Sequence, residues 1–335
     1  DVVAVGFRSG DDDVGSGLAE SGGAPPPRPA AGAGAPRRGD RRTRLGDGLS
    51  PMRAVPMLPA ALLLLGFMLG PILYSLYLAF TDSAIRGDGA SDTSFVGVQN
   101  FTDAFADGDF WNSVILTLVF TLISAVLGQN LLGMGLALLM ERSHRLVTFA
   151  VTSIVIAAWI LPEVVAGYLL YTFFADAGSL NAMLTAIGLP GQDLLFSAPI
   201  IAVSFANIWR GAAFSMLVYS AALSSVPGDV YESAALDGAG PVRRFVSVTV
   251  PLLRPAIATN LMLTTLQTLS VFGLIFIMTG GGPARQSQTL PLYMYEQAFS
   301  YGQLGYGTAV ALLLLLIGAL ASIAYLRLLP EEDKR

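Results

Sequence analysis

Cysteine is absent from the 335-residue chain, and histidine and lysine occur once each, as His144 and Lys334. The lack of cysteine excludes disulfides, thiolate catalysis and cysteine-ligated metal or iron–sulfur centres. A single histidine excludes any metal site that needs two histidine ligands. Because Lys334 is followed only by Arg335, no phosphate-binding loop of the G-x-x-x-x-G-K-[ST] type can occur. We expect no catalytic residues and no metal site, so ATP hydrolysis, if it drives this protein, must occur in another subunit.

Charge is scarce as well. Charged residues make up 13% of the chain, against about 25% in ordinary soluble domains, while 53% of residues are hydrophobic and the mean hydropathy is +0.62. Residues 1–55 are rich in Gly, Ala, Pro, Asp and Arg without apolar periodicity, which predicts a disordered tail. This charged region is too long for a cleavable signal peptide, and Met52 is a candidate start of the native chain. The composition indicates a membrane protein with a polar tail.

Six apolar runs follow, each long enough to cross a hydrocarbon core that needs about 20 helical residues. They cover about 57–80, 113–140, 147–174, 199–224, 252–278 and 306–328. Because backbone polar groups cannot stay unpaired in lipid, runs of this length are expected to be helices. The sequence therefore predicts an all-α membrane protein, with a six-helix domain at 56–329 and a short tail at 330–335.

Basic residues set the expected topology. Sixteen lie before the first run, in the turn at 141–146, in the segment 225–254 and at the C-terminus from Arg327 onward. Two, Arg86 and Arg285, lie in the remaining loops, and Arg210 lies within a run. Cytoplasmic loops carry an excess of basic residues, so both termini are expected in the cytoplasm.

The loop between the fourth and fifth runs is long and reads SVPGDVYESAALDGAGPVRRFVSVTVPLLRP. Asp229 followed by Glu232 is a start similar to a capping box, and Asp237 followed by Gly238 indicates a turn or helix stop. A short cytoplasmic helix is therefore expected at 229–237, and it is too short to be stable unless it packs on something. One interpretation is a helix that lies against the protein's own inner face.

This loop resembles the EAA loop of binding-protein-dependent ABC importer permeases, specifically the maltose-type carbohydrate-uptake group. TGGGP at 279–283 and TLPLYMYEQAFSYGQLGYGTA at 289–309 are similar to stretches of the same group. The resemblance covers about 56–329 and implies the type I ABC importer permease fold. It also implies that 229–239 is a coupling helix that seats in a cleft of an ATPase subunit. The implied contact residues are Tyr231, Glu232, Ser233, Ala234, Asp237, Gly238 and Ala239.

The resemblance implies partners too. The expected assembly contains a second related permease, two ATPase subunits that bind ATP and Mg²⁺, and an extracytoplasmic solute-binding lipoprotein. This chain would hold no cofactor, bind no nucleic acid, and cross a bacterial plasma membrane several times.

Polar residues inside the apolar runs are costly in lipid and mark candidate substrate positions. In the maltose-type group, the equivalents of Asn207, Arg210, Gly211, Phe214, Thr264 and Thr268 line the sugar site. Gln267 shares helical spacing with the last two. The alternative interpretation is that such residues only bond one helix to another. Gly273 departs from the group, in which many relatives carry an acidic residue after the equivalent of Phe272.

Arg210 needs a partner or water, because an unpaired arginine in the middle of a membrane costs at least about 2.5–3.5 kcal/mol. Glu163 lies at a similar depth in the third run, at about 1.5 Å of rise per residue. We expect a Glu163–Arg210 ion pair that lines or gates the pathway or, alternatively, serves structure alone. A further possibility is that Arg210 binds an anionic substrate.

The function predicted from these features is that of a permease subunit importing a di- or oligosaccharide by alternating access. The alternative is a permease for glycerol 3-phosphate or a related polyol phosphate. A distant alternative is an ion-coupled secondary transporter. Such a transporter would need carboxylates inside the membrane, and the apolar runs of this chain offer only Glu163.

Overall fold

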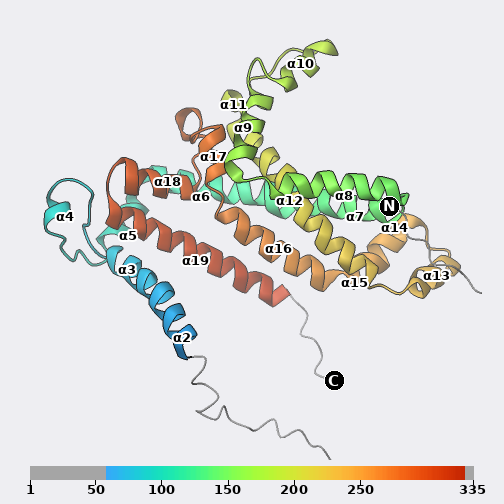
Figure 1. Ribbon diagram of the computed structural model, residues 1–335, viewed down its shortest axis with the longest axis horizontal. Helices are drawn as coiled ribbons and strands as arrows, with labels where there is room; N and C mark the ends of the chain where they lie inside the picture. Colours follow the sequence, from blue (N-terminus) through green and yellow to red (C-terminus); the bar gives the residue numbers. More distant parts are fainter. Residues whose placement is uncertain (1–57, 329–335) are drawn as a thin grey trace, which may run out of the picture. The chain divides into compact units, whose positions relative to one another are not determined.

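The computed structural model describes residues 58–328, and within them every regular element is a helix (Figure 1). The expected all-α class is confirmed for this part of the chain. The predicted tails at 1–55 and 330–335 lie outside the described residues. Within residues 58–328, three helices are long and apolar enough to cross a membrane, and two further pairs of helices qualify if each bent pair counts as one span.

The first apolar run forms a continuous helix from α2 (Leu58–Leu64) through the π-helical η2 (Leu65–Leu69) to α3 (Gly70–Leu78). The large apolar side chains of this helix are exposed, and Phe67, for example, is 79% exposed. Such exposure suits a lipid environment. Two short helices, α4 (Asp88–Ser91) and α5 (Gln99–Ala106), follow. The Asn100 amide ties α5 to the end of α3 by donating to the backbone carbonyls of Ala79 and Thr81 at 2.9 and 2.8 Å.

The second run is longer than predicted and spans residues Gly108–Glu141. It comprises α6 (Gly108–Phe120), the π-helical η3 (Thr121–Gln129) and α7 (Asn130–Glu141). Asp107 caps its start, because the Asp107 carboxylate accepts a 2.8 Å hydrogen bond from the Asp109 amide. The helix therefore begins five residues before the apolar run does.

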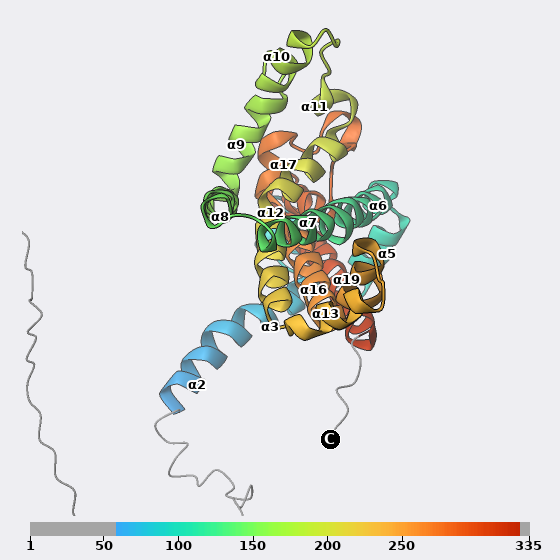
Figure 2. The same ribbon diagram turned by 90° about the vertical axis from the view of Figure 1, so that its right-hand side faces the viewer.

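The third run is not the straight helix expected over 147–174. It divides into α8 (Arg145–Ile160) and α9 (Glu163–Phe174), and the axis turns by 108° at the break. Pro162 explains the break, because proline lacks an amide hydrogen and restricts the residue before it to extended conformations. Two short helices, α10 (Ser179–Ala186) and α11 (Leu194–Ser197), complete this segment. In Figures 1 and 2, α9 and α10 extend away from the long α6–α7 run.

The fourth run, α12 (Pro199–Ser224), has the predicted bounds. It packs against α7, η3, α8 and α16. Small residues allow these helices to approach closely: a Cβ built on Gly133 of α7 would lie 2.4 Å from the Cβ of Ser215 in α12. The α12 helix is therefore the centre of the bundle.

The fifth run, expected as one helix over 252–278, is also divided. After α13 (Gly228–Leu236) come α14 (Pro241–Arg244), the π-helical η4 (Phe245–Thr249), α15 (Val250–Leu252), α16 (Arg254–Leu269) and α17 (Gly273–Met278). The helix axis bends by 72° between Leu252 and Arg254. Pro251 and Pro255 flank this bend, and proline has no backbone amide hydrogen to donate to a helical hydrogen bond. Residues 270–272 then separate α16 from α17.

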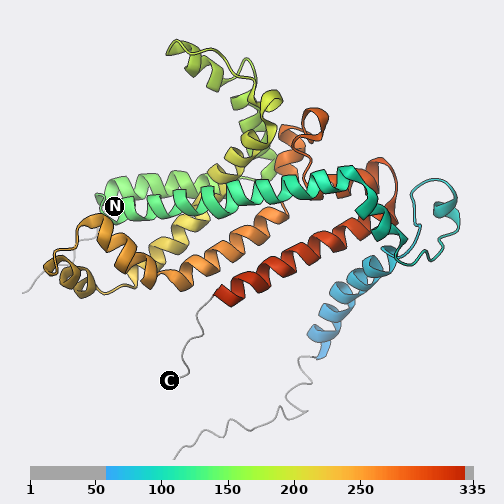
Figure 3. The ribbon, with the colours of Figure 1, turned by 180° about the vertical axis from the view of Figure 1, so that it is seen from behind.

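The last segment begins with η5 (Pro283–Arg285), α18 (Leu290–Tyr295) and the π-helical η6 (Glu296–Ser300), and it ends in α19 (Leu304–Leu328). Figure 3 shows α19 running beside α16. Arg285 pairs with Asp109, and its backbone carbonyl accepts a hydrogen bond from Asn112, so η5 is fixed to the start of α6. The largest buried cluster joins α9, α12 and α17, with Leu274 and Ile275 fully enclosed.

Candidate functional site

A polar cleft of about 510 Å³ lies beside the middle of α12, between the broken ends of two helices. Trp159 and Glu163 come from the two sides of the α8–α9 break, and Ser270 and Val271 come from the α16–α17 break. Non-helical backbone at membrane depth is tolerated only where protein or a water-filled cavity surrounds it. The two breaks therefore supply the kind of boundary that a substrate cavity in a membrane requires.

An ion pair forms one wall of this cleft. Arg210 Nη1 lies 3.2 Å from Glu163 Oε1, with 23% and 34% of the two side chains exposed. Arg210 Nε also donates to the Leu161 carbonyl at 3.4 Å, a carbonyl left free because Pro162 interrupts the helix. Glu163 lies in the first turn of α9, where the helix dipole favours a negative charge. Arg210 thus joins α12 to both sides of the broken third run.

Gly273 lies directly against this pair. A Cβ built at this position would be 3.0 Å from Glu163 Oε2, so a larger side chain has little room. The expected family pattern has an acidic residue here, which would place a second carboxylate beside Glu163 and disfavour both charges. In this chain the carboxylate comes from α9 instead.

Amide and hydroxyl groups also line the cleft. Asn207 Nδ2 donates to Ser124 Oγ at 2.9 Å and to Thr268 Oγ1 at 3.2 Å, and Gln129 Nε2 donates to the Asn207 carbonyl at 3.1 Å. Gly211 allows the Gln129 side chain to lie here, because a Cβ built on Gly211 would be 2.3 Å from Gln129 Cδ. These bonds join η3, α12 and α16 at the level of the cleft.

The structure brings together most of the sequence-predicted pathway residues. Those that line the cleft are Asn207, Arg210, Gly211, Gln267 and Thr268, together with Glu163. Phe214 lies outside the lining and packs its ring 6.0 Å from that of Trp159. Thr264 is 1% exposed and lies in a buried network. Sequence reasoning missed Gln129 and Trp159 as cleft residues, although a glutamine within an apolar run and a tryptophan three residues before Pro162 were both visible signals.

The buried network lies between α7, α12 and α16. Asn260 Nδ2 donates to Asn130 Oδ1 at 2.8 Å and to Ser215 Oγ at 2.9 Å, while Asn130 Nδ2 approaches Thr264 Oγ1 at 3.4 Å. The Tyr219 hydroxyl also donates to Asn130. These contacts bond helix to helix, which is the alternative role considered for polar residues in the spans.

The second candidate site is the segment 229–239, in and just after α13. The helix begins at Gly228, one residue earlier than expected, and no side chain caps its start, so the predicted capping-box start is wrong. The predicted stop is confirmed: Gly238 has φ +75°, and the amides of Gly238 and Ala239 donate to the carbonyls of Ala235 and Ala234 at 3.0 Å each. Glycine adopts this left-handed conformation without steric cost.

The outer face of α13 is uncovered in this chain. Leu236 is 89% exposed, and Glu232, Ser233 and Asp237 are exposed too. Tyr231 differs, because its hydroxyl is enclosed. A nine-residue helix is marginal without a packing partner, and α14 is its neighbour within the described residues.

These features define a class of protein. Apolar helices long enough to span a bilayer, a polar cleft between broken helices and an exposed short helix at one end are typical of a multi-pass membrane transport subunit. Among residues 58–328, no cluster of three or more His, Cys, Asp or Glu is placed to hold a metal ion.

Residues 129–332 match the family described as binding-protein-dependent transport system inner membrane component, and the chain belongs to this family. The resemblance found in the EAA loop is thereby confirmed. The chain is 33% identical over 293 residues to the sulfoquinovosyl glycerol transport system permease protein of Agrobacterium fabrum, covering 86% of this chain and 93% of the relative. It is 31% identical over 240 residues to the trehalose/maltose transport system permease protein of Thermococcus litoralis, covering 70% and 79%.

A solved structure has the same fold. It is that of a bacterial ABC transporter involved in the import of the acidic polysaccharide alginate, with a TM-score of 0.71 at 23% sequence identity. The match covers 84% of this chain and 96% of that chain. The architecture of a multi-pass ABC importer permease therefore extends over nearly all of the described helices.

Proposed function

We propose that this chain is the permease subunit of an ATP-driven importer whose substrate is a di- or oligosaccharide or a glycoside of similar size. The observation that carries this proposal is the polar cleft beside α12. Its volume of about 510 Å³ falls within the usual range of small-molecule pockets, about 300–1,000 Å³. Its amide and hydroxyl groups suit sugar hydroxyls, and Trp159 offers an aromatic face for a pyranose ring.

The named relatives support the same substrate class. Their names refer to transport of trehalose and maltose and of a sulfoquinovosyl glycerol. This does not favour the alternative of glycerol 3-phosphate. Within the cleft, Arg210 is neutralised by Glu163, so an anionic substrate would have to compete with a carboxylate already in place. A neutral glycoside meets no such competition.

The proposed topology has six membrane-spanning segments with both termini in the cytoplasm. The three straight helices and two bent pairs, together with the α2–α3 helix, account for six. The excess of basic residues on one side supports the orientation, and α13 is then cytoplasmic. The plasma membrane is the proposed location.

The proposed assembly pairs this chain with a second permease, two ATPase subunits and a solute-binding lipoprotein. ATP and Mg²⁺ would be bound by the ATPases. The exposed α13 segment would seat in an ATPase cleft, so that closure of the ATPases moves α13 and opens the cleft alternately to each side. Tyr231, Glu232, Ser233, Ala234, Asp237, Gly238 and Ala239 are the proposed contact and turn residues.

Uptake by the reconstituted complex tests the substrate class. Proteoliposomes that contain this chain and its three kinds of partner should accumulate a radiolabelled disaccharide such as maltose or trehalose when ATP is supplied to the ATPase side. Glycerol 3-phosphate should not be accumulated. Uptake of glycerol 3-phosphate without uptake of any glycoside would overturn the proposal.

Two glycines test the coupling role with a matched pair. Gly238 has φ +75°, whereas Gly240 has φ −65°, and neither has a neighbour within 4 Å of a built Cβ. Gly238→Ala strains the turn by about 1–2 kcal/mol, while Gly240→Ala does not. We expect substrate-stimulated ATPase activity to fall in Gly238→Ala and to persist in Gly240→Ala. Equal activity in both variants would contradict the assignment.

A further inference from the structure

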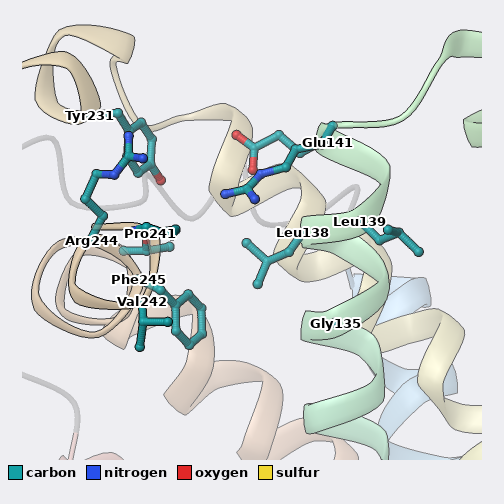
Figure 4. A pocket seen from close by; sticks show the side chains of 11 residues that line it. Gly135, Leu138, Leu139, Glu141, Tyr231, Pro241, Val242, Arg244 and Phe245 are labelled. Carbon is teal, nitrogen blue, oxygen red and sulfur yellow. The ribbon is translucent and has the colours of Figure 1, made fainter. Parts of the chain in front are cut away.

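A second and larger cavity, of about 700 Å³, lies at the end of the bundle that carries α13. Its walls are the last turns of α7 on one side and the α14–η4 segment on the other, with Tyr231 of α13 above (Figure 4). In Figure 4, Leu138 of α7 points across the opening toward Phe245, with Val242 beside it. The cavity is separate from the polar cleft beside α12 and shares no lining residue with it.

The lower part of the cavity is apolar and open. Val242 is 76% exposed and Leu139 59%, and Gly135, which also lines the cavity, has no atom within 4 Å of a built Cβ. Exposed apolar side chains at the end of a spanning helix are stable where hydrocarbon covers them. This part of the cavity therefore suits an alkyl chain.

The upper part of the cavity is polar and carries a net positive charge. Two arginines, Arg142 and Arg244, line the cavity, together with one carboxylate, Glu141. Arg244 Nε and the Tyr231 hydroxyl are both buried, and neither has a hydrogen-bond partner among the described residues. Figure 4 places the Arg244 and Tyr231 side chains next to each other. Enclosed donors without acceptors are uncommon in proteins and call for a ligand or water.

We propose that this cavity binds an anionic phospholipid. The lipid phosphate would accept hydrogen bonds from Arg244 and Tyr231 after a small side-chain rotation, and the acyl chain would lie against Leu138, Val242 and Phe245. Arginine forms strong charge-assisted bonds to phosphate, and basic pockets beside spanning helices on the cytoplasmic side recognise lipid head groups. A soluble sugar would leave the apolar wall of the cavity uncovered. An acidic peptide would match the positive charge but would not cover this apolar wall either.

The lipid would also affect the ATPase-coupling segment, because Tyr231 belongs to α13 and Arg244 to α14. A molecule bound between this segment and α7 would brace α13 against a spanning helix at the membrane surface. The proposal does not depend on the substrate of the importer, since the cavity and the polar cleft have different linings.

Lipid retention by the assembled complex tests the proposal. The complex is reconstituted into nanodiscs of phosphatidylcholine and phosphatidylglycerol in equal amounts, then extracted gently, and the bound lipid is counted by native mass spectrometry. Phosphatidylglycerol should be retained in preference to phosphatidylcholine. Arg244→Gln should lower its retention about fivefold, the effect of losing one arginine near a phosphate.

Arg243→Gln is the matched control. Arg243 is the neighbour of Arg244 in the same short helix and does not line the cavity, so its loss removes the same charge without touching the lipid. An equal loss of phosphatidylglycerol in both variants would overturn the proposal in favour of diffuse attraction to the membrane. If Arg244→Gln fails to assemble, Arg142→Gln gives the same comparison.

A cysteine at position 242 provides an independent test, because the chain has none of its own. In Val242→Cys, a fluorophore attached to the thiol should be quenched more by spin-labelled phosphatidylglycerol than by spin-labelled phosphatidylcholine. Cross-linking of this cysteine to a partner subunit, with no preferential quenching, would show that protein fills the cavity and would overturn the proposal.

Discussion

Replacing Gly133 by alanine tests the close contact between α7 and α12. A Cβ at Gly133 would lie 2.4 Å from Ser215 Cβ and 2.8 Å from the Met216 amide nitrogen. Because carbon atoms in contact stay about 3.5–4.0 Å apart, α7 and α12 would have to separate by about 1 Å. Gly135 lies two residues further along the same helix and has nothing within 4 Å. Gly135→Ala is therefore a control with the same chemical change.

The expected magnitude follows from comparing the two variants. Alanine favours a helix over glycine by about 1 kcal/mol at either position, so this gain cancels in the difference. Overpacking of a filled interface costs about 1–3 kcal/mol. Gly133→Ala should therefore be less stable than Gly135→Ala by about 1–3 kcal/mol. Ser215 also accepts a hydrogen bond from Asn260, so the separation of the helices should weaken the buried network as well.

The assay is thermal unfolding of the assembled complex in detergent, at one fixed scan rate because such unfolding is irreversible. Domains of 150–250 residues lose about 2–4 °C in transition temperature for each kcal/mol, and larger chains lose less. The transition of Gly133→Ala should lie several degrees below that of Gly135→Ala. Coincident transitions would refute the inferred close packing of α7 on α12.

Two further predictions concern the cleft. Arg210→Gln should lower substrate uptake more than the double variant Arg210→Gln/Glu163→Gln, because the single change leaves a carboxylate without its partner at 3.2 Å. Uptake that is lower in the double variant than in both single variants would contradict the ion pair. Trp159→Ala should raise the apparent KM for a glycoside several-fold. Trp159→Phe should raise it less, because an aromatic face remains. Equal KM values in the two variants would show that Trp159 does not contact the sugar through its ring.

Much of the fold could be predicted from the sequence, because the apolar runs exceed the length that a bilayer requires. The helix break at residue 161 could have been predicted as well, since Pro162 is a clear signal. The break at 270–272 could not, because Ser-Val-Phe is compatible with a continuous helix and no proline is present. It is a tertiary effect that the apolar pattern does not report.

The candidate site was harder to predict. Helical spacing shows which residues share one face of a helix, but it does not show what that face packs against. Asn207 and Phe214 are seven residues apart and share a face, yet Asn207 borders the cleft while Phe214 packs behind Trp159. Thr264 and Thr268 also share a face, but Thr264 is bonded within the network of Asn130. Which polar residue lines a cavity is decided by where the partner helices break.

The same reasoning explains why the intramembrane charges lie where they do. The break at Pro162 leaves the Leu161 carbonyl without a helical partner, and it also creates a helix start that favours an acidic residue at Glu163. Arg210 satisfies both groups from α12. With this carboxylate in place, an acidic side chain at position 273 would start from a Cβ only 3.0 Å from Glu163 Oε2. It would bring a second negative charge beside the first, and one arginine could not neutralise both. The proline, the ion pair and Gly273 are therefore parts of a single arrangement, in which the helix break positions the charge and the glycine leaves it room.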